Sequence, residues 1–75
     1  MIQAPTPGQH VKLNDEGIES IGGLTSWEQI QQARDMIITD VHRVPVTDGI
    51  DLYSINVNAS EINRFLITNR DVDLL

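Results

Sequence analysis

Short stretches of alternating hydrophobic and polar residues run through most of this chain, and such alternation is typical of strands that bury one face. In residues 9–14, Val11 and Leu13 fall on one face and the polar residues on the other. The alternation returns later in the chain, where many β-branched residues also favour strands. The pattern predicts strands at residues 9–14, 36–46, 50–57, 64–68 and 72–75.

The predicted strand at 36–46 contains an irregularity. Ile38 and Val41 both suit a core, but at this spacing they cannot share one face of a regular strand. One extra residue between them predicts a β-bulge. Pro45 lacks the amide hydrogen that a sheet ladder needs, so we expect the end of this strand at a sheet edge. The Asp48–Gly49 pair then predicts a hairpin turn into the next strand.

A helix signal begins at Thr25. Thr25 with Glu28 has the form of a capping box, and Ser26 with Gln29 has the same form shifted by one residue. The residues that follow are good helix formers. The sequence therefore predicts a helix of about two to three turns at 26–35.

The remaining segments are predicted as turns and irregular chain. Residues 18–24 space apolar residues as a helix does, but Gly22–Gly23 interrupts them, so at most one turn is expected. Residues 68–71 predict a tight turn. Residues 1–8 contain two prolines and no periodicity, and we interpret them as an extended lead-in to a single domain at 9–75.

Several spacings recur along the predicted strands: Gly8-x-x-Val11-x-Leu13, Ile38-x-x-Val41, Tyr53-x-Ile55-x-Val57, Phe65-x-Ile67 and Asn69-Arg70-Asp71-Val72-x-Leu74. These spacings and the order of the elements resemble small SH3-like β-barrels. The resemblance implies a mainly β fold, a small barrel of about five antiparallel strands with one short helix inserted after the first strand. A helix packed on an open antiparallel sheet is the alternative.

Composition and charge narrow the classes of function. The chain has 75 residues, enough for one domain, and a net charge of −6. Residues 1–35 and 36–75 each contribute −3, so there is no basic arm. This even acidity argues against binding to nucleic acid or to an anionic membrane surface. Cys is absent, which excludes disulfides, Cys-based zinc sites and thiol nucleophiles.

The sequence also bears on location. The longest apolar run, residues 36–38, is far too short to span a bilayer. Residues 1–7 lack the basic and apolar parts of a secretory signal. We therefore expect a cytoplasmic protein that makes no membrane contact.

Candidate catalytic and metal-binding residues are few. Asp40 lies two residues before His42 on the same strand face, so its carboxylate could meet the imidazole. A metal site with two histidines would also need His10 on the neighbouring strand, and we interpret both histidines as surface residues. No serine lies in a nucleophile elbow, and Asp48 and Asp51 lack the ligand pattern of a calcium loop. We expect no catalytic residue, no cofactor and no metal.

Trp27 is the only Trp of the chain and lies at the start of the predicted helix. A large aromatic dominates the burial of a small core, so we favour a plug that closes one end of the barrel. The alternative is an anchor at a protein interface, where Trp is enriched. Trp27, Ile30 and Arg34 lie on one helix face and form the candidate interface.

These observations favour a non-catalytic protein–protein interaction or assembly module. An accessory subunit and a small phage-type inhibitor of a host enzyme both belong to this class, and the expected partner is another protein or a second copy. The alternative is a nucleic-acid-binding SH3-like barrel. Five Lys and Arg residues and three aromatics give that alternative little support.

Overall fold

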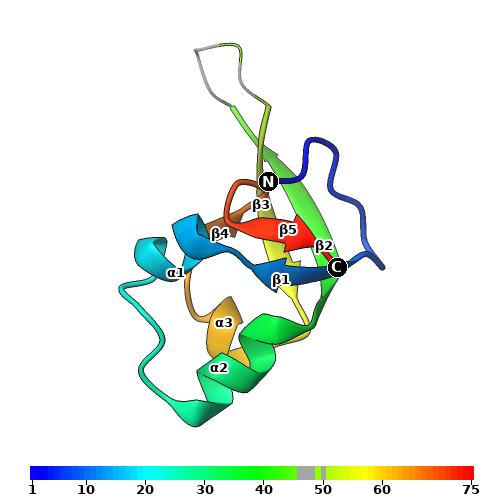
Figure 1. Ribbon diagram of the computed structural model, residues 1–75. Coiled ribbons are helices and arrows are strands. Elements are labelled where there is room, and N and C mark those ends of the chain that lie inside the picture. The colour runs from blue at the N-terminus through cyan, green and yellow to red at the C-terminus, as the bar shows by residue number, and fades with distance from the viewer. Residues whose placement is uncertain (46–48, 50) are drawn as a thin grey trace.

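The computed structural model describes residues 1–45, 49 and 51–75, so Asp48 of the predicted hairpin turn lies outside the described residues. Within the described residues the chain forms five antiparallel strands and three short helices (Figure 1). The mainly β class is confirmed. The strands are β1 (His10–Leu13), β2 (Met36–Val44), β3 (Leu52–Val57), β4 (Ile67–Thr68) and β5 (Val72–Leu74), and the helices are α1 (Asp15–Ser20), α2 (Trp27–Arg34) and α3 (Ser60–Asn63).

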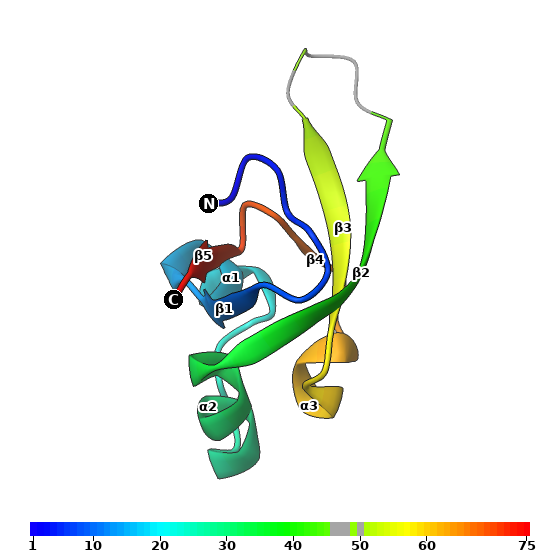
Figure 2. The same ribbon diagram turned by 90° about the vertical axis from the view of Figure 1, so that its right-hand side faces the viewer.

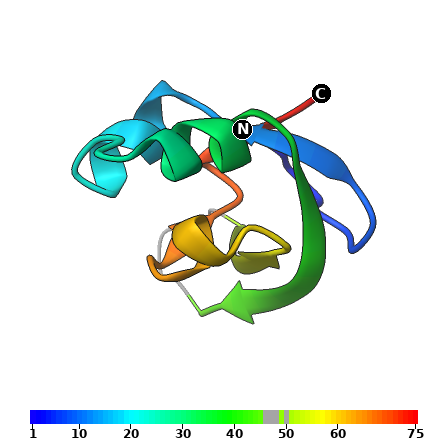
Figure 3. The ribbon, with the colours of Figure 1, turned by 90° about the horizontal axis from the view of Figure 1, so that it is seen from below.

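The strands form one open sheet in the order β4-β3-β2-β1-β5. The central strand β2 pairs with β1 through its first residues and with β3 along the rest of its length. Figure 3 shows β2 curving from the part of the sheet that holds β1 to the part that holds β3. Because β4 and β5 are the two edges, the described strands do not close, and the predicted SH3-like barrel is not confirmed.

The predicted β-bulge in β2 is confirmed. Ile38 pairs with Val57, and the register shifts before the next pair, Asp40 with Asn56. Such a bulge adds a residue to one strand and increases its bend. Ile38 is therefore fully buried while Val41, half-buried, also packs against the core.

One hydrophobic core joins the sheet and the helices. Ala33 of α2 and Ile62 of α3 contribute to it, and so does Ile2 from the predicted lead-in. The lead-in contains no helix or strand, but its backbone is bound: the Ile2 amide donates to the Asn69 carbonyl at 2.9 Å, and the Gly8 amide donates to the Ile38 carbonyl at 2.8 Å. Residues 1–8 are thus packed on the domain.

The prediction of a single helix is incomplete, because α1 and α3 also form. At α1, the Asn14 side chain accepts a hydrogen bond from the Gly17 amide at 2.9 Å, which caps the helix. The helix ends before Gly22, whose φ of +86° is left-handed. The Asn14 cap lies well before the Gly22–Gly23 pair. The helix therefore begins earlier and is longer than the single turn expected.

Helix α3 occupies part of the loop expected between β3 and β4 and shortens the strand predicted at 64–68 to Ile67–Thr68. The Asn63 side chain accepts from the Val57 amide at 2.8 Å and also donates to the Val57 carbonyl. This side chain takes the place of a neighbouring strand at the end of β3. The backbone is then free to turn into a short helix.

The two ends of the molecule differ in structure. Figure 2 shows β2 and β3 reaching beyond the rest of the chain at one end, with α2 and α3 side by side at the other. The Gln32 side chain of α2 accepts from the Glu61 amide of α3 at 2.9 Å, which ties the two helices together. The candidate interface therefore lies at the helical end.

Candidate interaction surface

Helix α2 begins at a capping box, and the box is the shifted of the two predicted forms. The Ser26 hydroxyl oxygen accepts from the Gln29 amide at 3.1 Å. The Gln29 side chain reaches back and accepts from the Thr25 amide at 2.7 Å and from its hydroxyl at 3.1 Å. The first bond satisfies an amide that the helix start leaves without a partner, and the return bonds of Gln29 reach Thr25, one residue before the cap. They also fix which side of α2 faces inward.

The predicted barrel plug is wrong, because the Trp27 side chain is 67% exposed. The buried positions of α2 are Gln29 and Ala33, one turn apart. Each residue turns an α-helix by about 100°, so Trp27 lies about 200° around the axis from Gln29. With Gln29 and Ala33 facing the core, Trp27 is on the opposite side of α2 and points away from the core.

An apolar groove lies between α1, α2 and β1. Its volume is about 260 Å³. Ile30 and Arg34 of the candidate interface line it, and Trp27 precedes Ile30 by one turn on the same stripe of α2. The complete lining is Lys12, Leu13, Ile18, Leu24, Ile30, Ala33 and Arg34. We call the stripe Trp27, Ile30 and Arg34, together with this groove, the helix–groove surface.

The charge of the groove is opposite to that of the whole chain. Lys12 and Arg34 are two of the five Lys and Arg residues, whereas the net charge is −6. No carboxylate lines the groove among the described residues. Asp35, which follows Arg34 in the chain, contacts the His10 ring at 3.2 Å, and Asp73, which stands opposite Lys12 in the sheet, contacts the Met1 amine.

Asp73 is the acidic group that stands nearest to Lys12 in the sheet, as its partner in the register of β1 and β5. Hydrogen bonds from the Met1 amine and from the Asn14 side chain lower the pKa of Asp73 below its ordinary value, and Lys12 adds a smaller effect in the same direction. Neither Lys12 nor Arg34 lies within ion-pair distance of a described carboxylate. Lys12 nevertheless stands opposite Asp73 in the sheet, so Arg34 is the less compensated cation of the groove.

The wall formed by α1 depends on close packing at Gly17. A Cβ atom at this position would lie 2.3 Å from the main-chain oxygen of Asp71 and 2.7 Å from Cδ1 of Leu13. Only glycine allows α1 to approach the turn between β4 and β5 so closely. This approach places Ile18, the next residue, in the lining of the groove.

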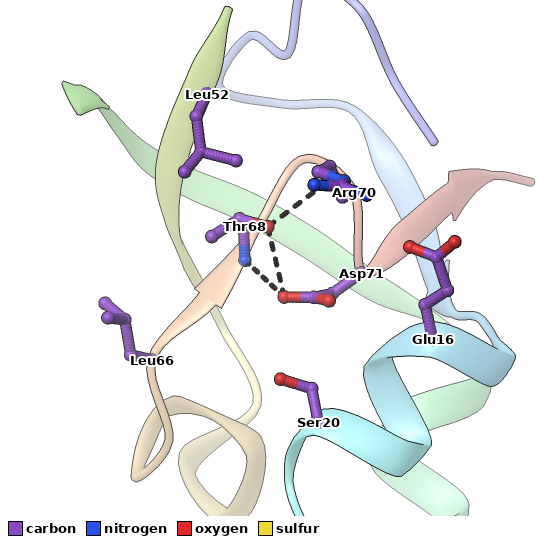
Figure 4. Close-up of a pocket in the computed structure, with 7 residues that line it drawn as sticks. All are labelled: Glu16, Ser20, Leu52, Leu66, Thr68, Arg70 and Asp71. Atoms are coloured by element: carbon purple, nitrogen blue, oxygen red, sulfur yellow. Dashed lines mark hydrogen bonds between the residues drawn. The ribbon is translucent and has the colours of Figure 1, made fainter. Parts of the chain in front are cut away.

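A second hollow, of about 370 Å³, lies on the other side of α1 (Figure 4). Figure 4 shows Glu16 and Ser20 of α1 on one side and Leu66 on the other. Asp71 also lines it, but its carboxylate accepts from the Thr68 amide at 2.8 Å and hydroxyl at 3.1 Å. These bonds close the predicted tight turn, which is confirmed. Asp71 thus has a structural role here.

The two histidines lie in separate contacts. His42 meets Asp40 at 2.9 Å, as the strand pattern suggested, and His10 meets Asp35. Both side chains are exposed, which confirms that they are surface residues. Within residues 1–45, 49 and 51–75, no three His, Asp or Glu side chains converge in a way that could hold a metal ion.

Sequence reasoning found the helix stripe but missed the opposite wall of the groove. The prediction that Leu13 is on a buried strand face is confirmed, but the sequence gives no sign that it also lines a groove with Ile18 and Leu24, which were expected in an interrupted turn. Their helical spacing was visible, but it did not indicate that the loop after α1 returns along α2. The sequence did not indicate that Lys12 borders a groove, because an exposed Lys on the polar face of a strand is common.

Comparisons of the chain with protein-family models, with curated proteins and with solved structures gave no match. None of the helices in the described part of the chain has the length and apolar character needed to cross a membrane.

Proposed function

We propose that this chain is a non-catalytic protein-interaction or assembly module that docks on another protein through the helix–groove surface. The observation that carries the proposal is the position of Trp27, 67% exposed and one helix turn from Ile30 of an apolar groove. Trp and Arg are the residues most enriched among those that dominate binding energy, and the stripe carries one of each. An accessory subunit and an inhibitor of a larger enzyme are two forms of this function.

The size and chemistry of the groove support a protein partner over other ligands. At about 260 Å³ it is smaller than most sites for small molecules, which measure roughly 300–1,000 Å³. An apolar surface with a polar rim is typical of sites that contact another protein. The net charge of −6 opposes nucleic acid.

The test compares two exposed apolar side chains on different faces. Wild-type protein, Trp27→Ala and Leu66→Ala are immobilised, and proteins retained from an extract of the native host are identified by mass spectrometry. Leu66 is the matched control because it is 77% exposed and lies outside the helix–groove surface. The Kd of each identified protein is then measured with purified components.

We expect Trp27→Ala to weaken binding by about 30-fold or more, the effect of losing a dominant anchor, and Leu66→Ala to leave the Kd unchanged. Sedimentation of the isolated protein tests a second copy as partner, and a dimer lost on Trp27→Ala supports the proposal equally. A partner that binds wild type and Trp27→Ala alike, or that is lost only on Leu66→Ala, overturns it.

A further inference from the structure

The groove combines an apolar lining with cations at its border. Leu13, Ile18 and Leu24 come from β1, α1 and the loop that follows it, while Ile30 comes from α2. Apolar side chains from four segments thus converge on one hollow, which can take up a large aliphatic or aromatic side chain. The volume of about 260 Å³ limits the occupant to a small number of side chains.

Two positively charged side chains border this apolar lining. Lys12 stands opposite Asp73 in the sheet register, so part of its charge is already balanced. The guanidinium of Arg34 has no ion-pair partner among the described carboxylates, although the protein is strongly acidic. Arg presents a planar fork of donors that fits a carboxylate, and such pairs strengthen when a partner excludes water.

We infer that the groove recognises an acidic–apolar segment of a partner protein, in which a large apolar side chain enters the hollow and a neighbouring Asp or Glu binds Arg34. The inference rests on the proposed function and names the chemistry of the partner. Charge complementarity selects this occupant. A basic or neutral segment would remove water from around Arg34 without giving it an anionic partner, and this would weaken binding.

A randomised library of twelve-residue peptides displayed on phage identifies the preferred segment. Selection is made on wild-type protein, with counter-selection on Ile30→Asp, which places a charge in the apolar lining. The consensus peptide and its version with each Asp or Glu replaced by the amide are then synthesised. Their Kd values are measured by fluorescence anisotropy against wild type, Arg34→Gln and the control Arg64→Gln.

We expect the consensus to place Asp or Glu beside a large apolar residue, and the amide version to bind about five- to tenfold more weakly. Arg34→Gln should remove this difference. Arg64→Gln removes the same charge from an exposed Arg that pairs with Glu61 outside the groove, and it should preserve the difference. Because Arg34 is also exposed, its variant is expected to fold, and circular dichroism checks this.

The inference is overturned by a basic or uncharged consensus, by the absence of enrichment over the counter-selection, or by a charge preference that survives Arg34→Gln. Asp73-Leu74-Leu75 of a second copy joins an acid to two exposed leucines, but this Asp73 already contacts the Met1 amine. Self-association that is lost on Arg34→Gln would make this segment the occupant and would overturn the choice of a partner protein. If a partner captured through Trp27 binds without any need for Arg34, the proposed function stands and this inference fails.

Discussion

Replacing Gly17 by Ala tests how α1 is packed, because two physical rules predict opposite results. Helix propensity alone predicts that Ala inside a helix stabilises the protein by about 1 kcal/mol relative to Gly. The tertiary structure predicts destabilisation. A Cβ at Gly17 would stand 2.3 Å from the main-chain oxygen of Asp71, closer than two such atoms can approach.

The magnitude follows from what must move. The added Cβ would also lie 2.7 Å from Cδ1 and 2.9 Å from Cγ of the buried Leu13, and the Asp71 carbonyl is held by the Asn14 amide at 3.0 Å. Overpacking of this kind costs about 1–3 kcal/mol, and weakening that hydrogen bond costs about 1 kcal/mol more. After subtracting the gain in propensity, Gly17→Ala should lower the free energy of unfolding by about 1–3 kcal/mol.

The assay is thermal and urea unfolding followed by circular dichroism. Each kcal/mol lowers the Tm of a domain of this size by about 4–8 °C. Glu19→Ala is the control, because Glu19 is an exposed residue of the same helix and its replacement should change stability by less than about 0.5 kcal/mol. A Gly17→Ala protein that melts at or above the wild-type Tm would refute the packing of α1 described here.

Three further predictions concern stability. Trp27→Ala should change the free energy of unfolding, measured by chemical denaturation, by less than about 0.5 kcal/mol, because the side chain is exposed. A loss of about 3–5 kcal/mol, typical of a buried aromatic, would show that Trp27 belongs to the core. Asn69→Ala should lower the free energy of unfolding by about 2–6 kcal/mol in urea denaturation. The fully buried Asn69 side chain accepts from the Tyr53 amide at 2.9 Å and donates to the Ile2 carbonyl at 2.7 Å, and both groups would lose this partner. A midpoint close to that of the wild type would contradict this. Asp73→Asn should be less stable than wild type at neutral pH, and the difference in Tm should close as the pH falls below 3.8. The reason is that a pKa lowered in the folded state adds stability, which is lost when the carboxylate is protonated. A difference in Tm that stays constant down to pH 2 would contradict this.

The sequence predicted the strands and the helix that depend on residues close together in the chain. Alternation around Val11 and Leu13 gave β1, and the spacing of Ile38 and Val41 gave the bulge of β2. Ser26 and the residues after it gave α2. Each of these features depends on neighbours within a few residues, so the chain itself carries the information.

The short helices show where local signals end. Helix α3 was missed because Ala59 offers no side-chain cap, and its start is bound by Gln32 from a distant helix instead. Helix α1 is longer than the single turn expected from the Gly22–Gly23 interruption, because Asn14 caps it before Ile18 and Gly17 lets it pack closely on the turn at Asp71. Both helices are stabilised by contacts far apart along the chain.

The sequence by itself therefore determined the mainly β class, the acidic character and the stripe of Trp27, Ile30 and Arg34 on one helix. Only the tertiary structure decided which way that stripe faces. An exposed and a buried aromatic look the same in a sequence, because burial depends on which side of the helix packs against the core. Here Gln29 and Ala33 occupy the core-facing side. The core has no place left for Trp27, and the side chain lies at the surface beside the groove.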